Sequence, residues 1–225
     1  EAVAALMGRD RFVIAGGVVG TLYSCSAYTG LTNLFPMLAE EPRLIEDLSA
    51  RILERHLEEI RRLAAAPADA IYIDDATAGC DMISPAHYER FSLPYVSAMV
   101  REIRRLGKRA ILIYFGGVAD RLEMIASTGA DALSCETSMK GYVNDIADVC
   151  RRVGRAMTVF GNIDPVNVLE KGADAALERE IAAQCAAGRT ARGFVLATGS
   201  PITPGTPLAR VRRFAELSRR HGARA

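Results

Sequence analysis

Short runs of apolar residues alternate along the chain with longer segments in which apolar residues recur at helical spacing. The apolar runs hold almost no polar residue before their last positions. They lie at residues 12–18, 71–75, 110–116, 132–136, 157–162 and 194–199. Runs of this kind are typical of strands buried on both faces, as in a parallel sheet. The pattern therefore predicts six parallel strands.

The segments between these runs have the period of amphipathic helices. In the first of them, apolar residues lie on one face and charged residues on the opposite face. In the second, Pro94 is expected to kink the helix or divide it in two. The predicted helices lie at residues 42–66, 84–107, 141–154, 165–188 and 207–222.

Strand and helix alternate with short links, which indicates parallel βα units. Two α/β architectures fit, a (β/α)8 TIM barrel and an open doubly wound sheet. Six units in 225 residues, starting at Glu1, favour a barrel of which this chain covers roughly strands three to eight. We therefore expect residues 1–225 to form a single barrel domain whose N-terminal part is missing. No Gly-x-Gly-x-x-Gly fingerprint follows the first strand.

Composition and charge narrow the range of partners. The formal net charge is +1, so no strong basic field favours nucleic acid. No stretch approaches the ~20 apolar residues that span a bilayer, so no membrane contact is expected. The five cysteines are widely spaced without a Cys-x-x-Cys pair, which is unlike a disulfide framework or a structural zinc site. Reduced thiols and a cytoplasmic location are expected.

Polar residues follow the predicted strands at their carboxyl ends, where ligands bind in barrels and in open α/β sheets. They are Ser24, Tyr28, Asp74, Asp75, Glu136, Asn162, Asp164, Thr198 and Ser200. Each has a structural alternative. Asp75 could cap the next segment, and Asn162 and Asp164 could be turn residues before the helix that starts at Pro165. Together they are stronger candidates, because the fold directs them to one mouth.

Histidine and cysteine are absent from these positions. His56, His87 and His221 all fall within predicted helices or near the C-terminus. A histidine-ligated metal or a histidine base at the mouth is therefore not expected from this part of the chain. Cys135 alternates with Glu136 on a strand and is expected to face the core.

Several motifs resemble the uroporphyrinogen decarboxylase superfamily. They are "GGVVGTLYSCSAY", "ISPAHYERFSLPYVSAMVREIRRLGKRAILIYFGG", "GADALSCE", "VFGNIDPVNVL" and "GFVLATGSPITPGTPLARVRRFAELSRR". The superfamily includes the decarboxylase of haem biosynthesis and corrinoid-linked methyltransferases such as methylcobamide:coenzyme M methyltransferase. The resemblance implies a (β/α)8 barrel and a homodimer.

The resemblance also locates the zinc ligands of those methyltransferases, a His-x-Cys on one strand and a second Cys in the last mouth loop. The matching positions here are Ile113, Phe115 and Ser200. A zinc site of this type stabilises a substrate thiol as thiolate, and Ile113 and Phe115 cannot provide such ligands. We therefore expect no metal in this half of the mouth and no cofactor bound tightly by this chain.

The decarboxylase pattern is incomplete as well. Its substrate tyrosine matches Tyr28, but its mouth histidine falls on Ser200 and its serine falls near Ala78. Its catalytic aspartate and its arginines lie on strands outside this sequence. A tetrapyrrole with many carboxylates requires several arginines at the mouth, and the strand ends here are almost free of Arg and Lys.

The leading hypothesis is an enzyme of the methyltransferase branch that exchanges a methyl group between a small molecule and a corrinoid protein docked over the mouth. Tyr28 and Asp75 are expected to line one pocket as catalytic residues. Substrate binding is assigned to Ser24, Glu136, Asn162, Asp164, Thr198 and Ser200. One alternative is decarboxylation of a uroporphyrinogen-like tetrapyrrole. Another is a catalytically inactive barrel that serves as a binding subunit.

Overall fold

The computed structural model describes residues 2, 6, 10–139 and 141–222. One parallel sheet has its six strands in chain order. The strands are β1 (Ile14–Val19), β2 (Ala70–Asp74), β3 (Arg109–Tyr114), β4 (Ala132–Cys135), β5 (Thr158–Phe160) and β6 (Phe194–Val195). This is the strand order of a barrel, and the predicted α/β barrel architecture is confirmed. An open sheet would have its strands reordered about a switch point.

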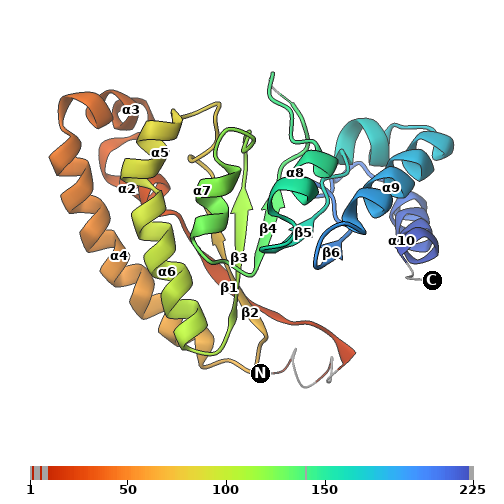
Figure 1. Cartoon of the computed structure of the whole chain (residues 1–225), viewed down its shortest axis with the longest axis horizontal. Helices are drawn as coiled ribbons and strands as arrows, with labels where there is room; N and C mark the ends of the chain where they lie inside the picture. Colours follow the sequence, from red (N-terminus) through yellow and green to blue (C-terminus); the bar gives the residue numbers. More distant parts are fainter. Residues whose placement is uncertain (1, 3–5, 7–9, 140, 223–225) are drawn as a thin grey trace.

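Helices connect successive strands and cover one face of the sheet (Figure 1). They are α2 (Thr21–Thr29), α3 (Leu31–Glu40), α4 (Pro42–Ala64), α5 (Pro85–Phe91), α6 (Leu93–Arg105), α7 (Leu122–Ser127), α8 (Ile146–Val153), η2 (Pro165–Glu170, a π-helix), α9 (Asp174–Gly188) and α10 (Leu208–Gly222). Among the described residues, none of these helices has the length and apolarity that a membrane crossing needs.

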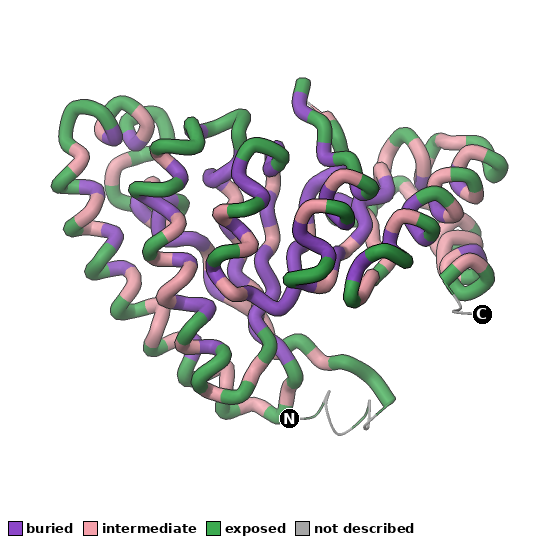
Figure 2. Tube along the Cα trace, in the orientation of Figure 1, coloured by how far each residue is buried: buried purple, intermediate pink, exposed green. Residues whose placement is uncertain are grey.

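The sheet separates two apolar layers of unequal size. Ile71 and Ile73 of β2 lie in the large core between the sheet and the helices. Ala70 lies on the other face, in a small layer against which Tyr72 packs. In a barrel, the face turned away from the helices is the interior. Figure 2 shows that burial is concentrated on the central strands and on the inward sides of the helices.

Several predicted boundaries change in the structure. The predicted helix 84–107 is divided at Ser92, just before Pro94, as expected. The predicted helix 141–154 is wrong in its first turn, because Asp145 caps a helix that begins at Ile146. The predicted helix 165–188 is two helices, separated at Gly172. The predicted strand 194–199 is ordered as a strand only at Phe194–Val195, beyond which the isolated pair Ile163 and Thr198 continues the contact with β5.

Candidate functional site

A carboxylate at the end of β4 joins the ends of three strands. Glu136 follows Cys135, which lies in the helix-side core as predicted, so the Glu136 side chain points to the opposite face. Glu136 is buried. Its Oε2 accepts hydrogen bonds from the Gly116 backbone N–H (2.9 Å) and the Tyr142 hydroxyl (2.5 Å). Its Oε1 accepts one from the Ser200 hydroxyl (3.2 Å). The carboxylate therefore links the loops that follow β3, β4 and β6.

The phenol of Tyr142 is a fixed donor in this arrangement. Burial, followed by the hydrogen bond to Glu136, raises the pKa of Tyr142 above its ordinary value. The phenol stays protonated at neutral pH and keeps donating to the carboxylate.

Two asparagines hold the backbone around Glu136. The Asn144 side-chain amide donates to the carbonyl oxygens of Glu136 (2.9 Å) and Gly116 (3.0 Å), and its oxygen accepts from the Val118 N–H (3.0 Å). The Asn162 amide donates to the carbonyl oxygens of Glu136 (3.0 Å) and Asn144 (2.8 Å). These bonds satisfy buried backbone groups, which gives both asparagines a structural role.

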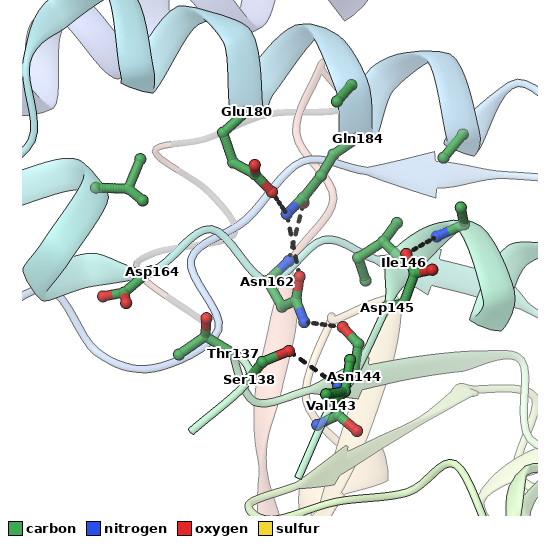
Figure 3. A pocket seen from close by; sticks show the side chains of 14 residues that line it. Thr137, Ser138, Val143, Asn144, Asp145, Ile146, Asn162, Asp164, Glu180 and Gln184 are labelled. Carbon is green, nitrogen blue, oxygen red and sulfur yellow. Dashed lines mark hydrogen bonds between the residues drawn. The ribbon is translucent and has the colours of Figure 1, made fainter. Parts of the chain in front are cut away.

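Helix α9 adds a third amide to this network (Figure 3). Gln184 donates to the Asn162 side-chain oxygen (3.1 Å) and accepts from the Asn162 N–H (3.1 Å). It also donates to Glu180 (2.9 Å). The amide donors and the side-chain oxygen of Asn162 are thus engaged by the protein itself.

A hollow of about 460 Å³ lies beside the network, between α9 and the loops that follow β4 and β5. Asp164 lines it, but both of its carboxylate oxygens serve the start of η2. Oδ1 accepts from the N–H groups of Val166 and Asn167 (both 2.8 Å), and Oδ2 accepts from the Asn167 side chain (2.7 Å). The geometry at Asp164 is that of a helix cap, the alternative that the sequence left open.

The two aspartates at the end of β2 point to opposite faces. Asp75 continues the face of Ile71 and Ile73 and is fully buried on the helix side. Its Oδ2 accepts from the Ser92 hydroxyl at the break between α5 and α6, while its Oδ1 has no hydrogen-bond partner among the described residues. Burial raises the pKa of Asp75 to about 6, against the opposing effect of the Ser92 hydrogen bond.

Tyr28 lies elsewhere, on the outer side of α2. It is 65% exposed and lines a hollow of about 630 Å³ between α2 and α4, together with Ser24 and His56. The Ser24 hydroxyl lies 3.0 Å from His56 Nε2. Asp75 is not in the wall of this hollow. The structure therefore separates Tyr28 and Asp75, which the sequence placed in one pocket, because Asp75 is turned into the helix-side core.

The loop between β2 and α5 is held by a buried arginine. Arg121 donates to the carbonyl oxygens of Ala78 (2.7 Å) and Ile83 (2.8 Å). Its guanidinium also makes two hydrogen bonds to the Asp120 carboxylate (2.8 and 3.1 Å) and lies 5.2 Å from the centre of the Tyr88 ring. The loops after β2 and β3 are thereby joined.

Of the positions that match zinc ligands in the resembled methyltransferases, Ser200 is in contact with Glu136. Ser200 donates to its carboxylate, and Ile113 packs on the interior apolar layer. In the part of the chain that the structure describes, no three His, Cys, Asp or Glu side chains are arranged to hold a metal ion. Thr198 is half-buried beside Ile163, and the neighbouring Gly199 has no room for a side chain, because a Cβ would collide with the backbone N–H of Thr137.

The residues that sequence reasoning missed are Tyr142, Asn144 and Gln184. Tyr142 and Asn144 fall in a segment predicted as helix, although Gly141 and the N-cap residue Asp145 marked a later helix start. Gln184 lies mid-helix, where the sequence offers no signal that its face meets a strand end.

Comparison with known proteins gives consistent matches. Residues 2–221 match the family model described as "Uroporphyrinogen decarboxylase (URO-D)". The uroporphyrinogen decarboxylase of Crocosphaera subtropica is 28% identical over 211 residues, which are 90% of this chain and 57% of that protein. The uroporphyrinogen decarboxylase of Tolumonas auensis is 30% identical over 190 residues, which are 83% of this chain and 51% of that protein. The chain thus spans about half the length of these curated relatives.

A solved structure of a methyltransferase from Methanosarcina mazei superposes with a TM-score of 0.85 at 21% identity. The match covers 99% of this chain and 62% of that one. At this identity the likeness concerns the fold.

Proposed function

We infer the function from the premise that this chain belongs to the uroporphyrinogen decarboxylase family. We propose that it is part of a barrel enzyme that exchanges a methyl group between a small substrate in the mouth and a corrinoid protein docked over it. The observation that carries the proposal is the charge of the strand ends.

Acidic residues outnumber basic residues in the segments that follow the strands. The acidic residues are Asp74, Asp75, Asp81, Asp120, Glu136, Asp145, Asp164 and Glu170, and the basic ones are Arg121, Lys140 and Lys171. Arg121 is fully buried and committed to Asp120 and to loop carbonyls. Lys140 lies outside the described residues. Binding of a polycarboxylate requires charge-assisted hydrogen bonds from several cations, so these strand ends favour a neutral or cationic substrate.

In this proposal the chain positions the substrate by hydrogen bonding. Glu136, fixed by Gly116, Tyr142 and Ser200, presents a carboxylate at the end of β4. Ser200, Thr198 and Asn162 shape the mouth around it. Asp75 is fully buried and accepts a hydrogen bond from Ser92, so it does not reach a ligand. In this proposal it acts indirectly, by holding the backbone at the end of β2 in place. Tyr28 is exposed on α2, on a surface that the corrinoid partner could cover.

The test is methylation of cob(I)alamin by the purified protein, followed by absorption spectroscopy of the cobalt, with a panel of methylated amines, ethers and thioethers as donors. We expect methylcobalamin with at least one donor. We expect Glu136→Gln to lower the rate at least tenfold, a difference of about 1.4 kcal/mol in the barrier. The matched control is Asp69→Asn at the opposite end of β2, where the side chain only accepts a hydrogen bond from the Val13 N–H.

A second function, decarboxylation of uroporphyrinogen, is favoured by the curated relatives that carry that activity in their names. Carbon dioxide release from uroporphyrinogen, without methyl transfer by any donor, would replace the methyltransferase proposal with this one. Loss of both activities would favour the inactive binding subunit.

A further inference from the structure

The interior face of β2 carries one carboxylate that the rest of the described chain leaves unpaired. Asp74 is the last residue of β2 and lies in register with Val19 of β1 and Ile113 of β3. Alternation along the strand places it on the face of Ala70 and Tyr72, away from the helices. Asp74 therefore faces the barrel interior at the level where the strands end.

The surroundings of Asp74 on this face are apolar. Val19 and Ile113 flank it, and Tyr72 lies two residues below on the same strand. One carboxylate oxygen, Oδ1, is buried and has no hydrogen-bond partner among the described residues, and no described Lys, Arg or His forms an ion pair with it. Burial raises the pKa of Asp74. Asp74 is half-buried. A carboxylate with one buried oxygen that lacks a donor gains from a positively charged partner.

The other strand-end carboxylates discussed above each accept at least one hydrogen bond from a side chain or backbone N–H of the chain. Glu136 accepts from Tyr142 and Ser200, and Asp164 caps η2. Asp75 accepts from Ser92 on the other side of the sheet. Asp74 is therefore distinct among the described strand-end carboxylates: it faces the interior and lacks a donor from the chain.

Tyr72 lies two residues before Asp74 on the same face of β2, and its ring is held in place by β1. Gly17 of β1 lies opposite Tyr72, and a Cβ at Gly17 would collide with the Tyr72 ring, so the ring rests against the glycine backbone. Tyr72 is half-buried and packs against the small apolar layer on the interior face. An aromatic face beside a carboxylate is the combination that binds quaternary ammonium groups, by cation–π attraction and charge.

We propose that Asp74 and Tyr72 bind the methylated ammonium group of the substrate, so that the substrate class is a quaternary or tertiary ammonium compound. This inference rests on the proposed function, for which it names the methyl donor. In the transfer, the cobalt(I) electron pair attacks the methyl carbon, the N–CH3 bond breaks with its pair left on nitrogen, and CH3–Co(III) forms. The nitrogen keeps the electron pair and is released as a neutral amine, which takes up a proton from solvent at neutral pH.

The first test is calorimetric titration of the purified protein with tetramethylammonium, with choline and with 3,3-dimethylbutan-1-ol, the uncharged isostere of choline. We expect both cations to bind, and choline to bind at least tenfold more tightly than the isostere. This comparison needs no variant. Equal affinity for choline and the isostere, or no binding of either cation, would overturn the proposal.

The second test uses two variants of one strand. Asp74→Asn should weaken choline binding at least tenfold and leave the isostere unchanged, while Asp69→Asn should leave both unchanged. Choline binding that Asp74→Asn does not weaken contradicts the assignment. Charge-dependent choline binding without methyl transfer would refute the proposed function alone. Methyl transfer from uncharged donors that Asp74→Asn does not slow would refute this inference alone.

Discussion

Asp74 and Asp75 are chemically identical neighbours that the sheet places in different environments. Asp75 lies among Ile71, Ile73 and the α5–α6 junction, where Ser92 is its hydrogen-bond donor. Asp74 lies on the opposite face beside Val19 and Ile113. Side-chain alternation in a strand places the two carboxylates on opposite faces, and the packing of the helices makes one face the core and the other the barrel interior.

Asp75 should make stability depend on pH. Its pKa rises from 3.8 in the unfolded chain to about 6 in the fold, so the fold favours the protonated form. The free energy of unfolding therefore has its full value below the unfolded pKa and falls as pH rises from about 4 to about 6, by about 3 kcal/mol in total. Asp75→Asn cannot ionise. The free energy of unfolding, measured with urea between pH 4 and 7, should therefore rise for the variant relative to the parent protein by roughly this amount.

The other carboxylates are the same in both proteins, so the difference between the two unfolding curves reports Asp75. Parallel pH dependences in the parent and in Asp75→Asn would mean that the Asp75 carboxyl titrates as it does in the unfolded chain.

The carboxylate of Asp75 packs so closely against Gly20 that no side chain fits at this position. The backbone angles of Gly20, φ −60° and ψ 147°, suit any residue, but an added Cβ would collide with Oδ1 of Asp75. Gly20→Ala should lower the free energy of unfolding by about 1–3 kcal/mol, the usual range for overpacking. Gly222→Ala is the matched control, because no atom lies within 4 Å of a Cβ there. Equal unfolding midpoints for the two variants would show that the start of α2 can shift away from Asp75 at no cost in stability.

At the scale of elements, Asp164 decides how η2 begins. Asp164→Ala removes an oxygen that accepts two backbone N–H groups and should cost about 1 kcal/mol in unfolding free energy. Asp164→Asn keeps an N-cap oxygen, so its free energy of unfolding should be within a few tenths of a kcal/mol of that of the parent protein. Chemical denaturation of the three proteins measures both effects. If Asp164→Asn abolished substrate binding at full stability, the carboxylate would be a ligand-binding group instead of a cap.

The sequence predicts strands better than their faces. The six apolar runs and their order are recovered because parallel strands buried on both sides need continuous apolar residues. Because these runs are apolar on both faces, they do not show which face of the strand is the barrel interior. The run 71–75 therefore could not show that Asp75 faces the core and Asp74 the interior. Helix starts were predictable where Ser84 and Pro85 mark them. The contacts of Glu136 with Tyr142 and Ser200 join distant loops, which no local pattern encodes.

At the scale of the molecule, the sheet is strongest in its middle. In the described chain β1 and β6 are its two edges, and β6 has only two residues, of which Val195 is exposed. β3 lies between two strands and is buried along most of its length. Hydrogen exchange by mass spectrometry should therefore be slowest in β2, β3 and β4 and fastest around β6, since edge strands open at lower cost. Uniform protection across all six strands would contradict this gradient.

The buried guanidinium of Arg121 has a consequence for the motion of the mouth. It holds the carbonyl oxygens of Ala78 and Ile83 and the carboxylate of Asp120, and its plane lies against Tyr88. Opening the loop after β2 would strand a desolvated charge, so that loop and the loop after β3 can only move as one body. Any opening at this side of the mouth must therefore displace both loops together, and neither loop can act alone as a lid over an arriving ligand.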